Sequence, residues 1–314
     1  MTERVKVWSV HLGVLALVFA AQYVLPTYHA TNLARIMVLA VFAMGYNIAF
    51  GYTGLLSLGH ALFFAAGFYG MGLPIGLLDW APVPALILGL IAGGVLAGLV
   101  GVLALRTAGV SFMIVTLMFA QAGYLTLLYL NTWTGGDEGF VVDRAARVIA
   151  GHDLSLDGTR YVAAFGLFAA AMIGCLWLVR SPFGRVMVAM RENEERSRML
   201  GYDPFRIKLI ALVLSGLYAG AAGAAYGLLF GYVGASFATI QYSILPMLYV
   251  LLGGAGTVLG PFLGAVLMFY LVDITSGYTD AYLFVVGAAL VGLVLFAPRG
   301  ILGNLRERFA PWLP

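Results

Sequence analysis

Ten apolar runs constrain this chain more than any other feature of its sequence. They lie at about residues 7–25, 33–50, 55–78, 83–105, 110–130, 161–179, 207–231, 240–252, 258–272 and 282–296. A helix needs roughly 20 mostly apolar residues to cross a bilayer, and it satisfies its own backbone hydrogen bonds there. Because 62% of the 314 residues are apolar and only 10% are charged, a soluble domain is excluded. The runs predict an all-α polytopic membrane protein of roughly 8–10 transmembrane helices, with residues 1–314 in a single transmembrane domain.

The basic residues predict the orientation of the chain in the membrane. The polar segment 180–208 holds seven Lys and Arg residues, and cytoplasmic loops of membrane proteins are enriched in these residues. Ten crossings from a cytoplasmic N-terminus place 13 Lys and Arg residues inside and four outside, namely Arg35, Arg144, Arg147 and Arg160. We therefore expect both termini and segment 180–208 in the cytoplasm, an external loop at 131–160, and an uncleaved first span.

Segment 180–208 carries its own helix signals. Start and stop signals are found at Ser181-Pro182, Gly201 and Asp203-Pro204. Glu192 with Arg196, and Glu194 with Arg198, are acid-before-base pairs with the i,i+4 spacing that supports an exposed helix. A small apolar patch, by which such a helix could dock, is offered by Val186, Met187 and Met190.

Two glycine-rich segments, 51–54 and 253–261, interrupt apolar runs in the two halves of the chain. Unwound backbone at membrane depth is tolerated inside protein or beside water, so such interruptions point to a transport pathway; tight turns at the membrane surface are the alternative. The candidate pathway residues are Gly51, Gly54, Ser57, Gly59, His60, Gly253 and Gly256. Small residues recur at i,i+4 spacing at 89–98 and 216–231, and they predict faces where helices pack closely. Packing within the chain is favoured over packing between subunits.

Enzymatic chemistry has no support in the sequence. It contains no phosphate-binding loop of the G-x-x-x-x-G-K-[ST] type, no metal-ligand spacing among its four His residues, and no Ser/His/acid set, so we expect no catalytic residue, metal or cofactor. Cys175 is expected to be a buried small apolar residue, and nothing suggests a nucleic-acid partner. His60 is favoured as a structural residue. Carboxylates inside the apolar runs are scarce, so an ion-coupled carrier is disfavoured and the energy for transport is expected to enter through segment 180–208.

Five segments, in this order, match hallmarks of one known family. They are GYTGLLSLGHALFFAAGFYG at 51–70, TGGDEGF at 134–140, FGRVMVAMRENEERSRMLGYDPFRIKLIALVLSGLYAGAAGAAYG at 183–227, GGAGTVLGPFLGA at 253–265 and FAPRGILG at 296–303. From about residue 33 onward the chain resembles the LivM-type permease subunits of ABC importers for branched-chain amino acids and related small amides. The Arg191-Glu192-Asn193 loop together with the APRG tail is more similar to the M-type subunit than to its H-type partner.

The resemblance implies a non-catalytic permease subunit of the bacterial inner membrane that forms half of a translocation pathway. Its implied partners are a second, LivH-type permease, two cytoplasmic ABC ATPase subunits and a periplasmic solute-binding protein, besides membrane lipid. Segment 180–208 would be the coupling loop that sits in a groove of the ATPase. The candidate coupling residues are Arg185, Arg191, Glu192, Asn193, Glu194 and Gly201.

Two departures from the family pattern leave the substrate open. Residues 195–198 are more charged than the Ala-rich version common in leucine permeases, and Gly-Phe-Tyr-Gly-Met-Gly at 67–72 resembles urea-type relatives. The length of the chain and TGGDEGF favour amino acids, so a permease for urea or short-chain amides is the second hypothesis. A stand-alone secondary transporter or solute channel, and a structural membrane scaffold, are alternatives of other classes.

Overall fold

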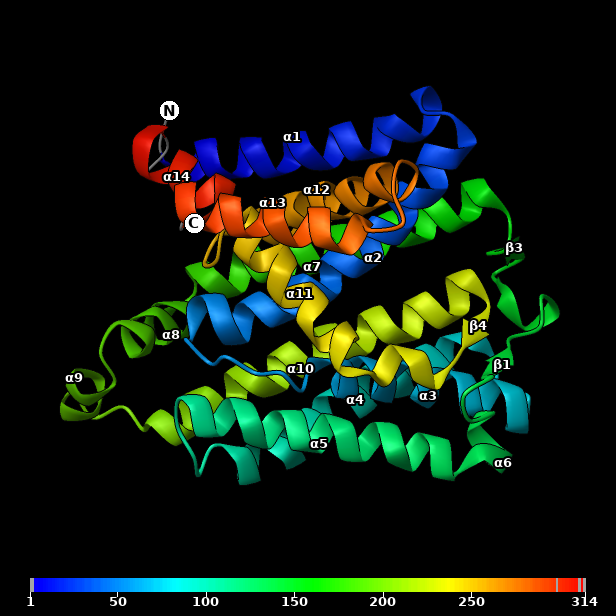
Figure 1. The fold of residues 1–314 in the computed structure, drawn as a ribbon, viewed down its shortest axis with the longest axis horizontal. Coiled ribbons are helices and arrows are strands. Elements are labelled where there is room, and N and C mark those ends of the chain that lie inside the picture. The colour runs from blue at the N-terminus through cyan, green and yellow to red at the C-terminus, as the bar shows by residue number, and fades with distance from the viewer. Residues whose placement is uncertain (1–2, 298, 310–311, 313–314) are drawn as a thin grey trace.

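The structure, a computed structural model, describes residues 3–297, 299–309 and 312 (Figure 1). Each apolar run forms a helix: α1 Glu3–Val24, α2 Thr27–Asn47, α3 His60–Leu78, α4 Pro82–Ala104, α5 Val110–Tyr129, α7 Asp157–Arg180, α10 Pro204–Phe230, α11 Ile240–Gly253, α12 Gly260–Ser276 and α13 Tyr282–Phe296. Within the described residues, seven of these helices are long and apolar enough to cross a membrane, and α11 and α12 are shorter apolar helices. The predicted all-α polytopic class is confirmed.

Shorter elements connect the long helices. They are α6 Asn131–Thr134, α8 Pro182–Glu192, α9 Glu194–Met199, α14 Gly300–Phe309, the π-helix η1 Ile48–Tyr52, and the 3-10 turns η2 Ala145–Arg147 and η3 Ala235–Ala238. The strands β1 Phe140–Val141 and β4 Tyr232–Val233 pair antiparallel, as do β2 Val148–Ile149 and β3 His152–Asp153.

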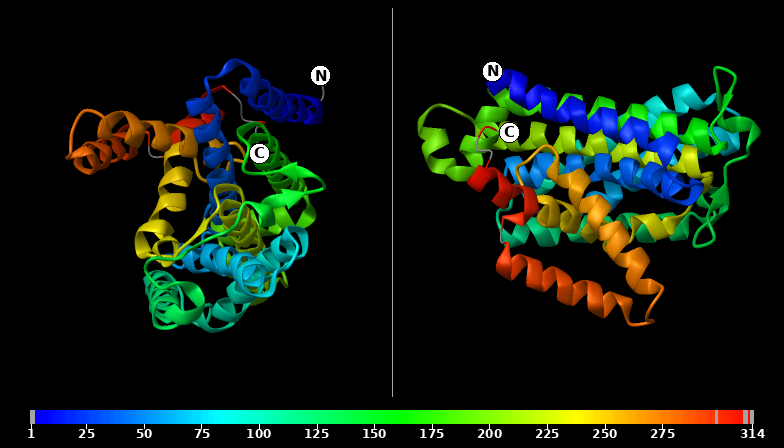
Figure 2. Two further views of the ribbon diagram at one scale, coloured as in Figure 1. Left: turned by 90° about the vertical axis from the view of Figure 1, so that its right-hand side faces the viewer. Right: turned by 90° about the horizontal axis from the view of Figure 1, so that it is seen from above.

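Helix α2 forms the centre of the bundle (Figure 1). Its residues from Ile36 to Asn47 are almost all inaccessible to solvent, and it packs against α7, α10, α11 and α12. A helix that is apolar on every side must be surrounded by other helices or by lipid, and here other helices surround it. By contrast, α1 lies at the edge, where the Tyr161 hydroxyl donates a 2.5 Å hydrogen bond to the Val18 carbonyl, and α12 and α13 project from another side (Figure 2).

The predicted small-residue faces bring α3, α4 and α10 together. A β-carbon on Gly93 would lie 2.5 Å from the carbonyl oxygen of Gly216, and one on Gly67 would lie 2.1 Å from the carbonyl oxygen of Gly220. Side chains at these positions would separate the helices, so the glycines permit close backbone approach. These close contacts are within the chain, which is the favoured of the two alternatives.

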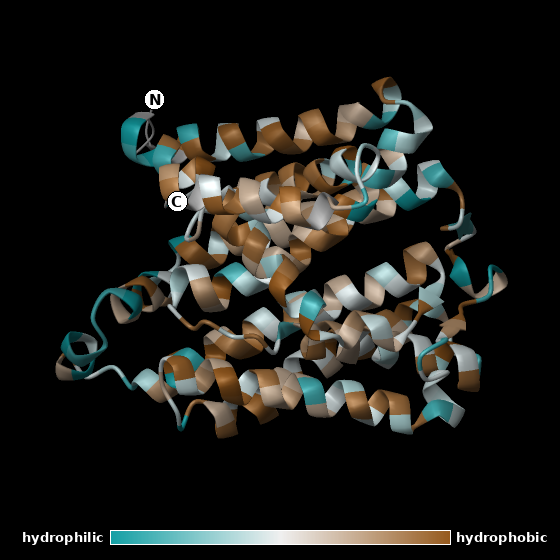
Figure 3. Cartoon of the chain, in the orientation of Figure 1, coloured by the Kyte–Doolittle hydropathy of each residue, from teal (hydrophilic) through white to brown (hydrophobic). Residues whose placement is uncertain are grey.

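Polar residues gather at the two ends of the bundle (Figure 3). One end, which we call the α8 end, carries α8, α9 and α14; the other, the hairpin end, carries α6 and the strands (Figure 1). At the hairpin end, Arg147 donates hydrogen bonds of 2.7 Å and 2.5 Å to the carbonyls of Leu228 and Leu229 in the last turn of α10. The basic residues of segment 180–208 therefore lie at the end opposite to Arg144, Arg147 and Arg160.

Candidate functional site

Segment 180–208 folds into two short helices joined by a sharp bend. Ser181 caps α8 by accepting a 3.1 Å hydrogen bond from the Gly184 amide. Asn193 takes up an extended conformation between α8 and α9, and its side chain accepts a 2.8 Å bond from the Arg196 amide. Gly201 has a φ of +90°, in the left-handed region that favours glycine. The bend is therefore held by local capping bonds.

One expectation for this segment is wrong in detail. Glu192 and Arg196 form no ion pair within the described part of the chain, because α8 ends at Glu192 and the bend at Asn193 destroys the i,i+4 spacing. Met187 and Met190 of the apolar patch are buried, so α8 docks through them onto the bundle of this chain.

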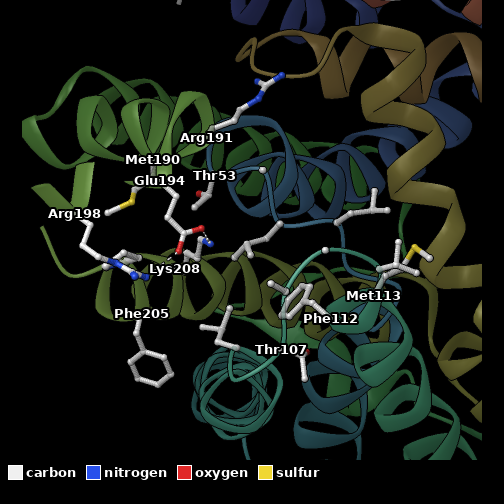
Figure 4. A pocket seen from close by; sticks show the side chains of 18 residues that line it. Thr53, Thr107, Phe112, Met113, Met190, Arg191, Glu194, Arg198, Phe205 and Lys208 are labelled. Atoms are coloured by element: carbon white, nitrogen blue, oxygen red, sulfur yellow. Dashed lines mark hydrogen bonds and ion pairs between the residues drawn. The ribbon is translucent and has the colours of Figure 1, made fainter. Parts of the chain in front are cut away.

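Glu194 closes the segment onto the bundle. Its carboxylate lies 2.6 Å from Nζ of Lys208 on α10, and the expected Glu194–Arg198 pair is present at 3.7 Å. These groups line a cavity of about 600 Å³ between the bend, residues 53–56 and the turn from α4 to α5. In Figure 4, Glu194 and Lys208 meet at this cavity while Arg191 points away from them. The side chains of Arg185 and Glu192 are exposed, so they point away from the bundle.

Arg191 joins α8 to the end of the π-helix η1. Its guanidinium donates a hydrogen bond to the carbonyl of Gly51, and its stem contacts Gly54, which has a φ of +77°. The last carbonyls of a helix have no partner inside that helix and attract cations, so an arginine is well suited to this position. A displacement of α8 would therefore be transmitted to η1.

The two glycine-rich segments meet at the α8 end. Asn47 is fully buried and donates a 2.9 Å bond to the Thr257 carbonyl, while its side-chain oxygen accepts a 2.9 Å bond from the Gly256 amide. Arg306 of α14 donates a 3.0 Å bond to the carbonyl of Gly256. We call the four residues Asn47, Gly51, Gly256 and Thr257 the glycine junction. Gly253 allows the adjoining turn, because a β-carbon there would lie 1.8 Å from the Gly260 carbonyl oxygen.

The remaining candidates lie deeper, where the chain returns from η1 in an extended segment and α3 begins. The amides of Leu58 and Ala61 donate to the hydroxyls of Thr116 on α5, at 3.2 Å, and Ser243 on α11, at 3.0 Å. Ser57 caps the Gly59 amide at 3.1 Å. Hydroxyls of different helices thus satisfy backbone groups that would be costly to bury unpaired.

His60 is the first residue of α3 and is fully buried. Its Nε2 lies 2.7 Å from the Ser215 hydroxyl near the middle of α10, and its ring packs edge-on against Tyr46 at 4.7 Å. Nδ1 of His60 and the hydroxyl of Tyr46 have no hydrogen-bond partner among the described residues. The structure thus ties His60 to α10 as part of the packing. Ser57, Gly59 and His60 lie together at the break between η1 and α3, which spans residues 53–59.

Comparison with known proteins assigns the chain to a family. A model described as "Branched-chain amino acid transport system / permease component" matches residues 28–297. The chain belongs to this family of permeases. It is 30% identical to the high-affinity branched-chain amino acid transport system permease protein LivM of Escherichia coli K12, over 98% of this chain and 77% of the relative, and 30% identical to LivM of Salmonella typhimurium, over 87% and 69%.

More distant permeases also match. The autoinducer 2 import system permease protein LsrC of Photorhabdus laumondii is 29% identical over 59% of this chain and 57% of the relative. No solved structure matches the chain. The relatives are permease components of import or transport systems, and a membrane-embedded helical chain with a structured polar segment at one end agrees with that class.

Several residues that form or contact the glycine junction and the break were not predicted from the sequence. Asn47, Thr116, Ser243 and Arg306 lie in none of the motifs quoted there, and Ser215 lies in one of them without being singled out. A signal was available for Asn47, because a lone amide inside an apolar run must find hydrogen-bond partners in protein. The hydroxyl residues carry no such signal, since Ser and Thr can bond to their own helix.

Proposed function

We propose that this chain is the permease subunit of an ATP-driven importer for branched-chain amino acids and that it forms half of the translocation pathway. Its partners in this proposal are a second permease of the LivH type, two ABC ATPase subunits and a solute-binding protein. The chain would lie in the bacterial inner membrane with the α8 end and both termini in the cytoplasm. Support comes from the family, from the substrate named for its LivM relatives, and from the charges at the α8 end.

One observation carries the coupling part of the proposal. Arg191 lies in the last turn of α8 and bonds to the carbonyl of Gly51, so a movement of the proposed coupling loop reaches the glycine junction without any intermediate element. ATPase closure would pull on α8 and α9, and η1 would follow through Arg191. The π-helix supports this role, since such irregular turns frequently occur at functional positions.

Glu192 and Arg191 should behave differently, because the Arg191 guanidinium bonds to the carbonyl of Gly51. Glu192 is exposed beside the bend, and we expect Glu192→Ala to lower the amount of ATPase that co-purifies with the tagged chain. Arg191 faces the glycine junction, and we expect Arg191→Ala to leave the ATPase bound while ATP-dependent leucine uptake falls by roughly tenfold, the effect of about 1.4 kcal/mol. Arg206→Ala serves as the control, because Arg206 is exposed and pairs with the neighbouring Asp203.

The alternatives give distinct results in the same experiment. A stand-alone transporter or channel would purify without an ATPase and would move leucine in ATP-free liposomes. A scaffold would tolerate both substitutions with uptake intact. A urea or amide permease would bring the ATPase along but would not take up leucine.

A further inference from the structure

Arg35 is a positively charged residue in a membrane-spanning helix, and no acidic residue in the described part of the chain pairs with it. Arg35 lies in the third turn of α2, although the sequence analysis counted it with the external residues. Its guanidinium carbon lies 5.1 Å from the centre of the Phe230 ring at the end of α10. In the part of the chain that the structure describes, Arg35 makes no ion pair and no hydrogen bond, and its Nε is buried.

The neighbouring arginines have partners that Arg35 lacks. Arg160 lies 5.8 Å from the same ring, but it pairs with Asp157 at 3.1 Å. Arg147 donates to the last carbonyls of α10. A cation over an aromatic ring is stabilised less than a cation that donates hydrogen bonds to a charged group. The ring therefore compensates Arg35 only in part.

The apolar interior of a membrane is a costly environment for this charge. Arginines within membrane-spanning helices face the interior of the assembly or water, and such residues mark substrate pathways. Arg35 is only half-buried in this chain, so the assembled protein must present it either to a partner subunit or to the pathway.

An aromatic row leads inward from Arg35. Tyr226 packs against Phe230 at 4.7 Å, Phe237 against Tyr226 at 5.2 Å, and Tyr242 against Phe237 at 4.7 Å. Tyr242 directly precedes Ser243, which caps the break at the start of α3. Phe230, Phe237 and Tyr242 are half-buried, so they offer an apolar wall beside the guanidinium.

We propose that Arg35 receives the carboxylate of the transported molecule and that the aromatic row beside it contacts the apolar side chain. This inference rests on the proposed function and specifies the substrate class of the same pathway. A guanidinium forms strong paired bonds with a carboxylate. Urea and other neutral amides bring no negative charge to balance Arg35, so the site favours amino acids over the amide alternative.

The first test measures binding to the purified permease–ATPase complex without its solute-binding protein. Ligands that bind the folded state raise the thermal unfolding midpoint. We expect leucine to raise it and leucinamide, which has the same side chain but no carboxylate, to leave it unchanged. Arg35→Gln should weaken leucine binding by roughly tenfold or more, the scale of a lost charged hydrogen bond, and Arg35→Lys should retain part of it. Equal stabilisation by both ligands, or unchanged leucine binding in Arg35→Gln, would overturn the inference.

The second test measures ATP-dependent leucine uptake in proteoliposomes. Arg35→Gln should reduce uptake while the ATPase remains bound, whereas Arg144→Gln, at an exposed external arginine, should not. The lipid composition separates two sources of negative charge. If Arg35 holds a lipid phosphate, uptake by the wild type requires phosphatidylglycerol in phosphatidylcholine vesicles and the inference is wrong; equal uptake with and without it supports the substrate carboxylate.

The two proposals can fail independently. Normal uptake by Arg35→Gln in an ATP-driven complex would overturn the carboxylate site and leave the importer standing. Leucine binding that depends on Arg35 in a chain that transports without ATP would overturn the importer and leave the carboxylate site standing.

Discussion

The amide nitrogen of Gly256 lies 2.6 Å from the point that a β-carbon on Gly51 would occupy. The backbones at Gly51 and Gly256, which are far apart in the chain, therefore touch. The side chain of Asn47 also bonds to the Gly256–Thr257 turn. Arg191 and Arg306 reach this junction from α8 and α14. Both helices lie at the α8 end, so the junction gathers elements of the end that we propose to be cytoplasmic.

Gly51→Ala should disrupt the glycine junction. The new methyl group would overlap the Asn47 side chain and the Gly256 amide, both held by hydrogen bonds, and overpacking of this kind costs about 1–3 kcal/mol. We expect a lower thermal unfolding midpoint in detergent. Gly13→Ala in α1 is the matched control, because a β-carbon there meets nothing within 4 Å. Equal midpoints for the two variants would contradict the close contact.

Arg306→Ala should loosen the turn between α11 and α12. Arg306 donates to the Gly256 carbonyl, so its loss should raise hydrogen–deuterium exchange across residues 253–260 by roughly tenfold for about 1.4 kcal/mol. Arg308 on the same helix is exposed, and Arg308→Ala should leave exchange unchanged. An equal rise in both variants would mean that α14 responds to charge alone and that the hydrogen bond is unimportant.

The Glu194–Lys208 pair should hold the bend of segment 180–208 against α10. A double-mutant cycle with Glu194→Gln and Lys208→Met should give a coupling energy of about 1 kcal/mol, the upper end for an ion pair that is partly exposed. The Asp203–Arg206 pair is more exposed and should give a smaller value in the same measurement. Proteolysis within segment 193–203 reports the opening of the bend, and additive effects of the two substitutions would argue against the pair.

Arg147→Ala should destabilise the hairpin end. The side chain satisfies two carbonyls at the C-terminus of α10, and leaving them without donors costs about 1–3 kcal/mol. Arg144→Ala should change the free energy of unfolding by less than about 0.5 kcal/mol, because Arg144 is exposed and surface ion pairs contribute little. Thermal unfolding of the two variants side by side measures the difference.

Local signals in the sequence predicted much of this protein. Hydropathy located each helix, because crossing lipid demands a continuous apolar stretch wherever the helix packs. Ser181 and Asp203 cap helices with bonds to amides two or three residues away, so the chemistry that starts a helix lies within one short segment. The positions of the glycines in the sequence also indicated interruptions of the apolar runs and faces of close helix contact.

Only the tertiary structure decided which surfaces of those helices meet. The runs that form α1 and α2 have mean hydropathies of 1.7 and 1.8, yet 22% of one and 89% of the other is buried in the bundle. Lipid and a protein interior are both apolar, so hydropathy cannot distinguish a helix that faces one from a helix that faces the other. For the same reason the contact of Gly51 with Gly256, the bond from Arg191 to Gly51 and the position of Arg35 over the Phe230 ring became visible only when segments distant in the chain were brought together.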